Sequence, residues 1–334
     1  MTAANVEAVY ATAVADALAE FPVTVRSLEL LHVSENVTWR VTDETGQRYV
    51  LRLHRPGYHT LDELKSERSW IRALHQAGIR VPQGILTRSG QEYATVRVPA
   101  AGEVRHAGLA HWTDGEVLER LLTTRTATLD DPQSLDHWFV QLGALIAELH
   151  DQASGWTPPP GFSRHSLDAD GLMGEQPFWG RFWEHPSLTV AERALLAQAR
   201  SRLHRELSAL GRTGDDYSVI HADLHSGNLL VNGQTLAVID FDDAGFGWHL
   251  YDLAVALRPY QDQPVFNRIV DAVLRGYRSR RPLTNEAAAL IPMFLLIRRL
   301  ASVGWIMQRP ELGVALEGTE IELLCRDVQA FLAS

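Results

Sequence analysis

The sequence predicts an α+β protein of two lobes, in which an N-terminal antiparallel sheet with a helix precedes a mainly helical part that carries one hairpin. Strand patterns with a period of two residues are concentrated before residue 112, and helical patterns dominate after residue 115. The length of 334 residues also exceeds the usual size of a single hydrophobic core. We therefore expect lobes at residues 1–112 and 113–334.

Composition indicates a globular protein without a general affinity for polyanions. Hydrophobic residues make up 46% of the chain and charged residues 22%, and the net charge of -10 makes nucleic acid or an anionic membrane a poor partner. The single cysteine, Cys325, cannot form an intrachain disulfide. The N-terminus lacks a basic start, and the apolar stretch at 287–297 is too short to span a bilayer. We expect a cytoplasmic protein.

The first lobe is expected to begin with an amphipathic helix at residues 1–21 and to continue as a meander of strands at 23–31, 36–44 and 48–55. The apolar residues of the last two strands alternate, so each set shares one face, namely Val37, Trp39 and Val41, and Tyr49, Leu51 and Leu53. A helix from Leu61 to about His75 follows, and Gly78 ends it. Two further strands, 92–99 and 104–112, surround a turn at 100–103.

The second lobe shows long amphipathic helical patterns at 134–152 and 188–210, and helices from residue 250 to the end. The stretch between the first two helices, residues 154–186, is rich in proline, glycine and aromatic residues and has no clear period. Such a stretch is either a substrate lid or a surface loop held by its own aromatic side chains.

The hairpin follows the motif HADLHSGN at 221–228. An Asn232-Gly233 pair separates two apolar runs, and this pair is a strong hairpin signal because both central turn positions need a positive φ. Folding the hairpin brings Asp223 and Asn228, before its first strand, toward Asp240 at the end of its second. Two carboxylates and an amide oxygen are hard ligands suited to Mg²⁺.

The residues alone leave more than one chemistry open. A metal hydrolase could use His221, Asp223 and His225, although no further cluster of histidine and aspartate completes a closed coordination set. Each histidine could equally be a hydrogen-bonded loop residue. Asp252 begins a helical pattern, where an acid is favoured by the positive end of the helix. The spacing of His, Asp, Asn and the later Asp is typical of the catalytic loop of kinases.

The motif resembles the H-G-D-x-H-x-x-N loop of the protein-kinase-like phosphotransferases, which include aminoglycoside phosphotransferases, choline kinases and homoserine kinases. Ala222 stands in place of the usual glycine, and IDFDDAG at 239–245 is similar to the metal-binding segment of that superfamily. SENVTWRV, YVLRLHRP and DFDDAG are similar to stress-response kinase A, so the resemblance covers most of the chain. It implies a bilobal protein-kinase-like fold, ATP or another NTP, and Mg²⁺.

The resemblance also implies a role for each residue of the motif. Asp223 would orient or deprotonate the attacking hydroxyl, and Asn228 and Asp240 would hold Mg²⁺. The remaining members are expected to support the site. His221 would fix the loop, His225 could donate to the transferring phosphoryl oxygens, and Asp252 would brace the loop through backbone N–H groups.

The nucleotide is expected to use both lobes. Arg52 lies on the strand face opposite Leu51, and Glu67 lies on the inward stripe of the next helix, so the two are expected to pair and to position the phosphates. Arginine here departs from the lysine of protein kinases and grips phosphate differently. The remaining candidates are loop residues Ser34 and Asn36, the backbone at Ala110 to Trp112, and the adenine-lining Leu230 and Ile239. The glycine-free loop at 32–37 could instead be a plain hairpin turn.

These observations predict an ATP- and Mg²⁺-dependent phosphotransferase acting on a hydroxyl. The short segment between Asp240 and Asp252 favours an open site and a small-molecule acceptor, whereas the similarity to stress-response kinase A favours a protein Ser/Thr acceptor. Two further functions stay open, namely the metal hydrolase and a nucleotide-binding pseudokinase, which Arg52 and the glycine-free loop suggest. Trp156, Phe178, Trp179 and Trp183, with the helix near Met293 to Trp305, could line the acceptor pocket or simply pack in the core.

Overall fold

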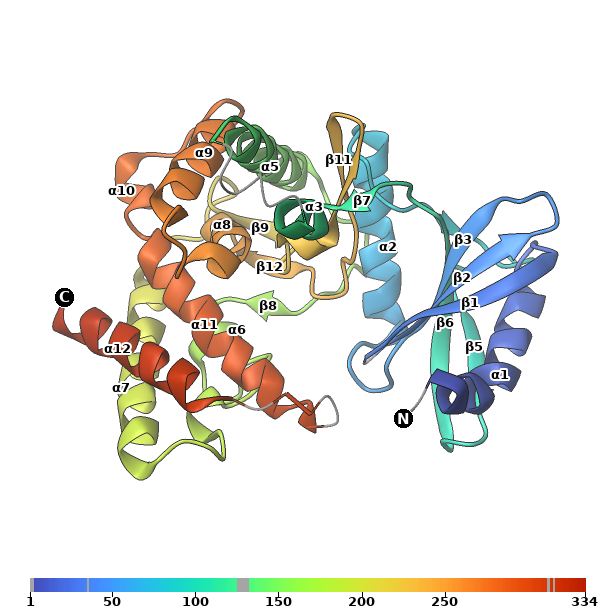
Figure 1. Ribbon diagram of the computed structural model, residues 1–334, viewed down its shortest axis with the longest axis horizontal. Coiled ribbons are helices and arrows are strands. Elements are labelled where there is room, and N and C mark those ends of the chain that lie inside the picture. Colours follow the sequence, from blue (N-terminus) through green and yellow to red (C-terminus); the bar gives the residue numbers. More distant parts are fainter. Residues whose placement is uncertain (1–2, 35, 125–131, 311–312, 315) are drawn as a thin grey trace. The chain divides into compact units, whose positions relative to one another are not determined.

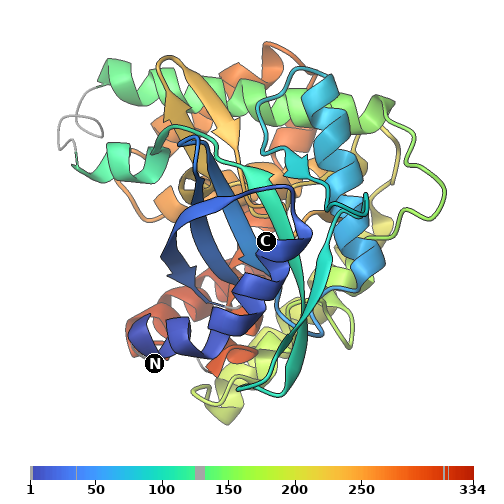
Figure 2. The same cartoon turned by 90° about the vertical axis from the view of Figure 1, so that its right-hand side faces the viewer.

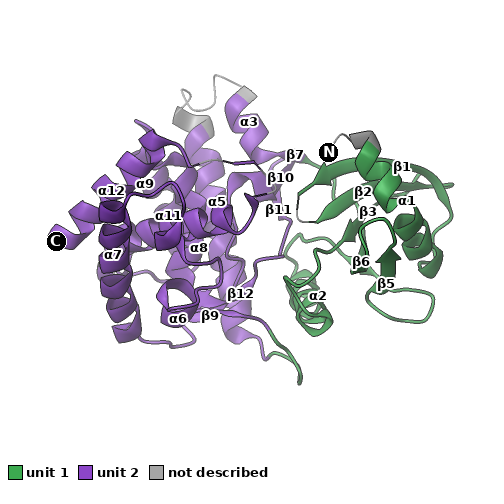
Figure 3. Cartoon of the chain, turned by 90° about the horizontal axis from the view of Figure 1, so that it is seen from below, with its two compact units in different colours: residues 1–115, 158–163 green, residues 116–157, 164–334 purple. Residues whose placement is uncertain are grey.

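The computed structural model describes residues 3–34, 36–124, 132–310, 313–314 and 316–334. Residues 1–2 of the predicted first helix and Glu35 of the predicted phosphate loop lie outside the described residues. The chain forms two compact units (Figure 3). Unit 1 comprises residues 1–115 and 158–163, and unit 2 comprises residues 116–157 and 164–334.

Unit 1 is an antiparallel sheet with two helices. Its elements, in chain order, are α1 (Ala3–Glu20), β1 (Val25–Val33), β2 (Val37–Asp43), β3 (Arg48–Leu53), α2 (Leu61–Gln76), β4 (Gly84–Ile85), β5 (Ala94–Val98) and β6 (Glu103–His111). The strand order is β1-β2-β3-β6-β4, and β5 also pairs with β6. All of these pairs are antiparallel, which confirms the predicted meander. The sequence pattern missed the two-residue strand β4.

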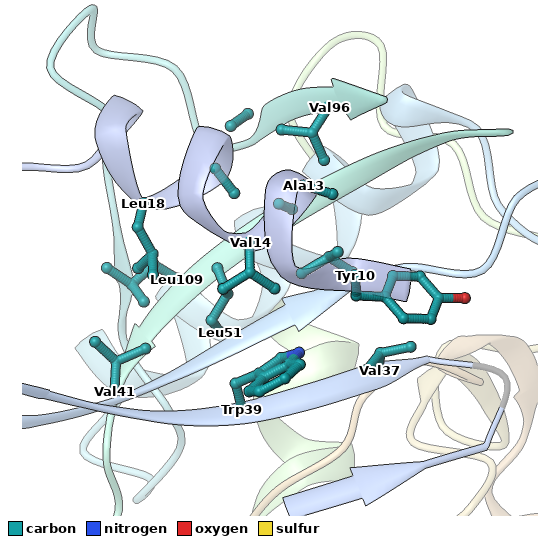
Figure 4. Close-up of a cluster of buried hydrophobic side chains, with 14 of the residues drawn as sticks. Tyr10, Ala13, Val14, Leu18, Val37, Trp39, Val41, Leu51, Val96 and Leu109 are labelled. Atoms are coloured by element: carbon teal, nitrogen blue, oxygen red, sulfur yellow. The ribbon is translucent and has the colours of Figure 1, made fainter. Parts of the chain in front are cut away.

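One face of this sheet is buried under α1. Val14 and Leu18 of the helix pack with Trp39, Leu51 and Leu109 of the strands (Figure 4), and Figure 2 shows α1 in dark blue lying across the sheet. Alternate strand residues are buried because the pleat sends every second side chain to the same face. The side chain of Arg52 therefore leaves β3 on the face away from this cluster.

Helix α2 begins and ends where its sequence predicts. Thr60 caps it: the Thr60 hydroxyl accepts from the Glu63 N–H, and the Glu63 carboxylate accepts from the Thr60 N–H. Gly78 follows the helix with φ +88°, a conformation that glycine adopts without steric cost. The buried face of α2 includes Leu64 and Glu67, as the apolar stripe predicts.

Unit 2 is mainly helical with two small sheets. Its elements are β7 (Glu116–Val117), α3 (Leu118–Thr124), α5 (Pro132–Gly155), β8 (Ser166–Leu167), α6 (Ala169–Met173), η1 (Phe182–Glu184), α7 (Val190–Ala209), β9 (Tyr217–Ile220), η2 (Ser226–Asn228), β10 (Leu229–Asn232), β11 (Thr235–Val238), β12 (Gly245–Trp248), α8 (His249–Leu257), η3 (Arg258–Tyr260), α9 (Phe266–Arg278), α10 (Asn285–Ala288), α11 (Ile291–Met307) and α12 (Gly318–Ala333) (Figure 1). The sheet orders are β11-β10-β7 and β8-β12-β9.

The predicted hairpin forms, but its turn lies one residue later than predicted. Asn232 pairs with Thr235, so Gly233 and Gln234 are the central residues. Gly233 has φ +64°, whereas Asn232 is part of β10 and has no positive φ. Glycine at the first central position is the requirement of a type II′ turn, so one glycine suffices and the asparagine is free to extend the strand.

Close approach of α5 and α9 forms part of the unit 2 core. A Cβ at Gly143 would lie 2.0 Å from the backbone oxygen of Val273, and one at Gly276 would lie 1.9 Å from that of Val140. These glycines therefore allow the two backbones to touch. The stretch Asn285–Met307 is long and apolar enough to cross a membrane, yet 61% of its most apolar window is buried inside the protein, as in a core helix.

The irregular stretch at 154–186 is partly core. Its aromatic residues Trp179, Phe182 and Trp183 are buried, and the indole of Trp179 stacks on Tyr251 of α8. Part of the stretch, 158–163, belongs to unit 1, where the Ser163 N–H donates to Ser66 Oγ at 2.9 Å. Of the four aromatic residues considered for the acceptor pocket, Trp179 and Trp183 are therefore packed in the core.

Candidate active site

The motif at 221–228 forms a loop between β9 and β10 that is held by one buried carboxylate. The Oδ2 of Asp252 accepts from the His221 N–H at 3.0 Å, and its Oδ1 accepts from the Ala222 N–H at 2.7 Å. Ala222 has φ +65°, a left-handed conformation that costs an alanine roughly 1–2 kcal/mol. The side chain of Asp252 is fully buried, so these bonds are not shared with solvent. Asp252 thus contacts the loop through two backbone N–H groups.

A second buried group supports Asp252 from α5. His150 Nε2 lies 3.2 Å from Asp252 Oδ2, and His150 Nδ1 lies 3.0 Å from the Tyr277 hydroxyl. A neutral imidazole that donates from Nε2 and accepts at Nδ1 satisfies both contacts. Burial lowers the pKa of His150 well below its usual value, which favours this neutral form. Burial raises the pKa of Asp252, and the charge of His221 and the backbone N–H bonds oppose that rise.

Both oxygens of the Asp223 carboxylate accept hydrogen bonds. Asn228 Nδ2 donates to Oδ2 at 3.0 Å and to the Asp223 carbonyl at 2.9 Å, while Arg298 Nη2 donates to Oδ1 at 2.6 Å. Burial acts to raise the pKa of Asp223, but the hydrogen bond from His225 and the charge of Arg298 outweigh it and lower this pKa to about 2. Asp223 is therefore ionised at neutral pH and can accept a proton or a hydrogen bond.

The two histidines of the motif have different partners. His221 accepts at Nδ1 from the Asp223 N–H at 3.3 Å, and its Nε2 lies 3.1 Å from the Ile239 carbonyl, to which it donates. His225 accepts at Nδ1 from the Gly227 N–H at 3.0 Å, and its Nε2 lies 3.4 Å from Asp223 Oδ2. His221 thus ties the loop to the residue before Asp240. The Nε2–H of His225 is directed at the Asp223 carboxylate, so a bond to a phosphoryl group would require a change of partner.

The hairpin brings the two predicted metal ligands toward each other. The Ile239 N–H donates to the Asn228 carbonyl at 3.0 Å, so Asp240 follows directly on a residue bonded to Asn228. The Asn228 amide nitrogen is engaged by Asp223, which leaves its Oδ1 as the side-chain atom suited to a cation. An amide oxygen and one carboxylate fit Mg²⁺, which takes few protein ligands and completes its shell with phosphate and water. Within the described residues, no group of three or more His, Cys, Asp or Glu side chains is arranged to hold a metal.

The predicted phosphate-positioning residues both lie in unit 1. Arg52 stands on β3 opposite Thr38 of β2 and Gly108 of β6, and its side chain is half-buried. Glu67 lies on the buried face of α2 and is only 6% exposed. The pairing of these two side chains stays a prediction.

The other unit 1 candidates are engaged in the sheet. The Ser34 N–H donates to the Asn36 carbonyl at 3.1 Å, and the Asn36 side-chain oxygen accepts from the Arg55 N–H at 2.9 Å. Their role toward the phosphates stays a prediction. Ala110 pairs with Val50 and with Gly84. These bonds stabilise the turn and the strand end whether or not a nucleotide is bound.

The strand end at the predicted hinge is also bonded within unit 1. The His111 N–H donates to Gln83 and the Trp112 N–H to Arg48, at 2.9 and 3.0 Å. These two N–H groups are thus unavailable to adenine without a rearrangement. In unit 2, Leu230 of β10 is buried and Ile239 is half-buried.

A cavity of about 660 Å³ in unit 1 is separate from these candidates. It lies along α2 and the segment 82–92, and its lining includes Lys65, Arg68 and Arg72. None of the predicted nucleotide-binding residues is among the described residues that line it. Arg68 and Arg72 are already bonded, to Tyr93 and Glu92 respectively.

Sequence reasoning missed Arg298, His150 and Tyr260. Tyr260 donates to Ser226 Oγ at 2.8 Å and so holds the 3-10 turn that precedes β10. A signal existed for Arg298, because a cation inside the apolar run of α11 requires a partner. A similar signal existed for His150, a polar residue on the apolar side of α5. Neither signal names the partner, since Asp223 and Asp252 are far away in sequence.

Comparison with known proteins shows the family of the chain and supports its fold. The pattern of the phosphotransferase enzyme family matches residues 28–288. Homoserine kinase of Pseudomonas aeruginosa is 30% identical over 295 residues, which cover 86% of this chain and 81% of that protein. A solved structure of a microcompartment-associated aminopropanol kinase is 33% identical, with a TM-score of 0.79, and the match covers 96% of this chain and 94% of that one.

A third similar protein, amicoumacin kinase hAmiN in complex with AMP-PNP, Ca²⁺ and Ami, has a TM-score of 0.78. The match covers 98% of this chain and 95% of that one, at 23% identity, and it supports the fold alone. The mixed fold predicted from the sequence, with an antiparallel N-terminal sheet and a helical C-terminal part, is thereby confirmed.

Proposed function

The chain belongs to the phosphotransferase enzyme family, and from this premise we propose that it transfers the γ-phosphoryl group of ATP to a hydroxyl of a small-molecule acceptor. The proposal rests on one observation above others. Asp223 is an ionised carboxylate on a loop that buried Asp252 holds in place, and it is bonded to Asn228, whose carbonyl accepts from the residue before Asp240.

The chemistry assigned to the loop follows from these contacts. The acceptor hydroxyl binds Asp223, its oxygen attacks the γ-phosphorus, and its proton passes to the carboxylate. A bond forms between the acceptor oxygen and phosphorus while the bond from phosphorus to the bridging oxygen breaks, and ADP leaves with that electron pair. His221 and Asp252 keep the loop in shape during this transfer.

Asn228 and Asp240 would hold Mg²⁺. When bound, the ion neutralises the charge of the nucleotide phosphates. For the nucleotide itself, unit 1 would contribute Arg52 toward the phosphates with Glu67 as its anchor, while Ser34, Asn36 and the Ala110 to Trp112 backbone remain candidates. Unit 2 would contribute the apolar side chains of Leu230 and Ile239.

A small-molecule acceptor is supported by the relatives, because homoserine and aminopropanol, in the names of two similar kinases, are small compounds with a hydroxyl. The metal hydrolase is less well supported. Both ring nitrogens of His221 are engaged within the protein, so this histidine would have to give up one of these bonds to bind a metal. We also retain the prediction of a cytoplasmic location.

The test is a screen for ADP formation with Mg²⁺ and a panel of hydroxy amino acids, amino alcohols, sugars and generic protein substrates, with GTP compared against ATP. A phosphorylated small molecule identified by mass spectrometry supports the proposal. Phosphorylation of the protein substrates alone would favour a protein Ser/Thr kinase, and ester hydrolysis without nucleotide would favour the hydrolase.

A pair of variants separates catalysis from binding. Asp223→Asn should lower kcat by about 10²–10⁴-fold, the usual contribution of a general base, with nucleotide affinity nearly unchanged. Asp271→Asn, at an exposed position on α9, is the matched control and should retain full turnover. Nucleotide binding without turnover for any acceptor, in the wild-type chain, would support the pseudokinase instead.

A further inference from the structure

Arg298 is a cation within the apolar helix α11 that contacts the Asp223 carboxylate. Its Nη2 lies 2.6 Å from Asp223 Oδ1, and its side chain is 18% exposed, against 24% for Asp223. A charge-assisted bond of this length between two largely buried groups is stronger than a surface ion pair. It also relieves both groups of the cost of an unpaired buried charge.

The contact fixes the carboxylate on the side opposite Asn228. Arg298 donates to Oδ1, and Asn228 donates to Oδ2. His225 Nε2 also faces Oδ2, at 3.4 Å, so rotation of the carboxylate would break contacts on both oxygens. Each oxygen has two acceptor sites, so a site on Oδ1 remains for an acceptor hydroxyl.

Arg298 is itself held from the other side. Its guanidinium lies 5.8 Å from the centre of the Trp179 ring, and that ring stacks on Tyr251, with centroids 5.9 Å apart and planes at 14°. Tyr251 immediately precedes Asp252, which braces the catalytic loop. Arg298 therefore joins three elements, namely the loop, α8 and the aromatic segment that precedes α7. Asp243 and Arg258 also influence Arg298 electrostatically, with opposite signs.

We propose that Arg298 is a positioning residue for phosphoryl transfer, which holds the Asp223 carboxylate in the single orientation that can receive the acceptor hydroxyl. This inference rests on the proposed function of Asp223. It assigns Arg298 no bond to the nucleotide and no share in the proton transfer. Its consequence is that loss of the arginine should affect turnover far more than nucleotide binding.

The chain provides a matched control at the next residue. Arg299 stands on the same helix, its side chain is 8% exposed, and it forms an ion pair with Asp327 of α12. Arg299→Gln therefore removes a buried arginine and breaks a buried ion pair, as Arg298→Gln does, but away from Asp223. Any loss that comes only from weaker folding should appear in both variants.

The experiment measures kcat, the KM for ATP and the urea unfolding midpoint of Arg298→Gln, Arg298→Lys and Arg299→Gln. We expect Arg298→Gln to lower kcat by about 10²-fold, the order caused by a misplacement of roughly 1 Å, with the KM for ATP within about twofold of wild type. Arg298→Lys keeps the charge but loses the planar fork, so it should restore part of the rate. Arg299→Gln should keep kcat.

A crystal structure of Arg298→Gln tests the positioning role without a measurement of activity. The Asp223 carboxylate should occupy a different or mixed rotamer. A wild-type kcat in Arg298→Gln, an unmoved carboxylate, or equal losses of kcat in the Arg298 and Arg299 variants would overturn the positioning role. Absence of turnover in the wild-type chain would instead count against the proposed function. The position of the Asp223 carboxylate in the crystal structure of Arg298→Gln would still show whether Arg298 orients it.

Discussion

Replacement of Asp252 by alanine tests whether the catalytic loop depends on one buried carboxylate. In the native chain this side chain is fully buried and accepts from His221 N–H, Ala222 N–H and His150 Nε2. The variant leaves three donors without their acceptor. A buried donor that loses its partner costs about 1–3 kcal/mol, so we expect a loss of about 3–5 kcal/mol after allowing for local relaxation and entry of water.

The assay is urea unfolding followed by circular dichroism and tryptophan fluorescence, with kcat measured under native conditions. The predicted loss is a large part of the 5–15 kcal/mol that stabilises a typical domain, so the variant should still fold at low temperature but unfold at a clearly lower urea concentration. Turnover should fall further than the folded fraction, because Ala222 must keep its left-handed conformation without Asp252 to offset the strain.

A second variant and a control show which results would contradict the role of Asp252 in bracing the loop. Asp252→Asn keeps the shape and one acceptor oxygen, but it turns an amide N–H₂ toward donors, so it should lie between wild type and Asp252→Ala. Asp271→Ala, on the exposed face of α9, should change stability by less than about 0.5 kcal/mol. If Asp252→Ala unfolds within about 1 kcal/mol of wild type and keeps its turnover, the bracing argument is wrong.

Three further predictions concern stability. The first concerns His150 and His249, whose rings stack and whose pKa values are lowered by burial. Because only the unfolded chain then takes up protons on these two histidines, the free energy of unfolding should fall as pH drops below about 6.5. The expected fall is about 2 kcal/mol between pH 6.5 and 5.5. His249→Gln should remove about half of that loss in urea titrations at the two pH values. Gly143→Ala should cost more than about 2 kcal/mol because its Cβ would lie 2.0 Å from a backbone oxygen of α9, whereas Gly155→Ala, with nothing within 4 Å, should be nearly neutral by the same measurement. Gly233→Ala should cost about 1 kcal/mol because φ is +64°, and an unchanged unfolding midpoint would contradict the assigned turn.

The sequence predicted the sheet of unit 1 because its signal is local. Alternation in β2 and β3 decides which side chains face α1, and a register error of one residue would expose every one of them. The turn at Gly233 was placed one residue too early, since an Asn-Gly pair suits two turn types and only the strand register decides between them. Strand β4 has two residues, too few for any period to show.

The catalytic loop was predictable to the extent that its residues are close in sequence. Asp223, Asn228 and the hairpin that leads to Asp240 lie within one stretch, and turn chemistry connects them. The groups that hold this stretch come from elsewhere in the chain. Arg298 is 75 residues from Asp223, and His150 is 102 residues from Asp252. A single sequence shows that such buried polar side chains need partners, but it does not show which partners the packing of α5, α8 and α11 supplies.

Backbone strain independently supports the stretch from His221 to Asp240 as the catalytic part of the molecule. Among the described residues, the non-glycine positions with positive φ are Ala222 at +65° and Asp240 at +64°. Each costs roughly 1–2 kcal/mol and persists only where neighbouring bonds hold it. At Ala222 these bonds come from Asp252. Beside Asp240, the backbone of Ile239 is fixed by Asn228 and His221. Both strained residues adjoin or belong to the group of Asp223, Asn228 and Asp240, so the bonds that hold them also hold the site. Ala222→Gly tests this directly, because glycine is the usual residue at this position of the motif and keeps the N–H that donates to Asp252. The steric cost disappears while the bond stays, so the unfolding midpoint should stay equal or rise and kcat should stay near that of wild type; a large loss of kcat would show that the site depends on the alanine side chain and not on the bond to Asp252.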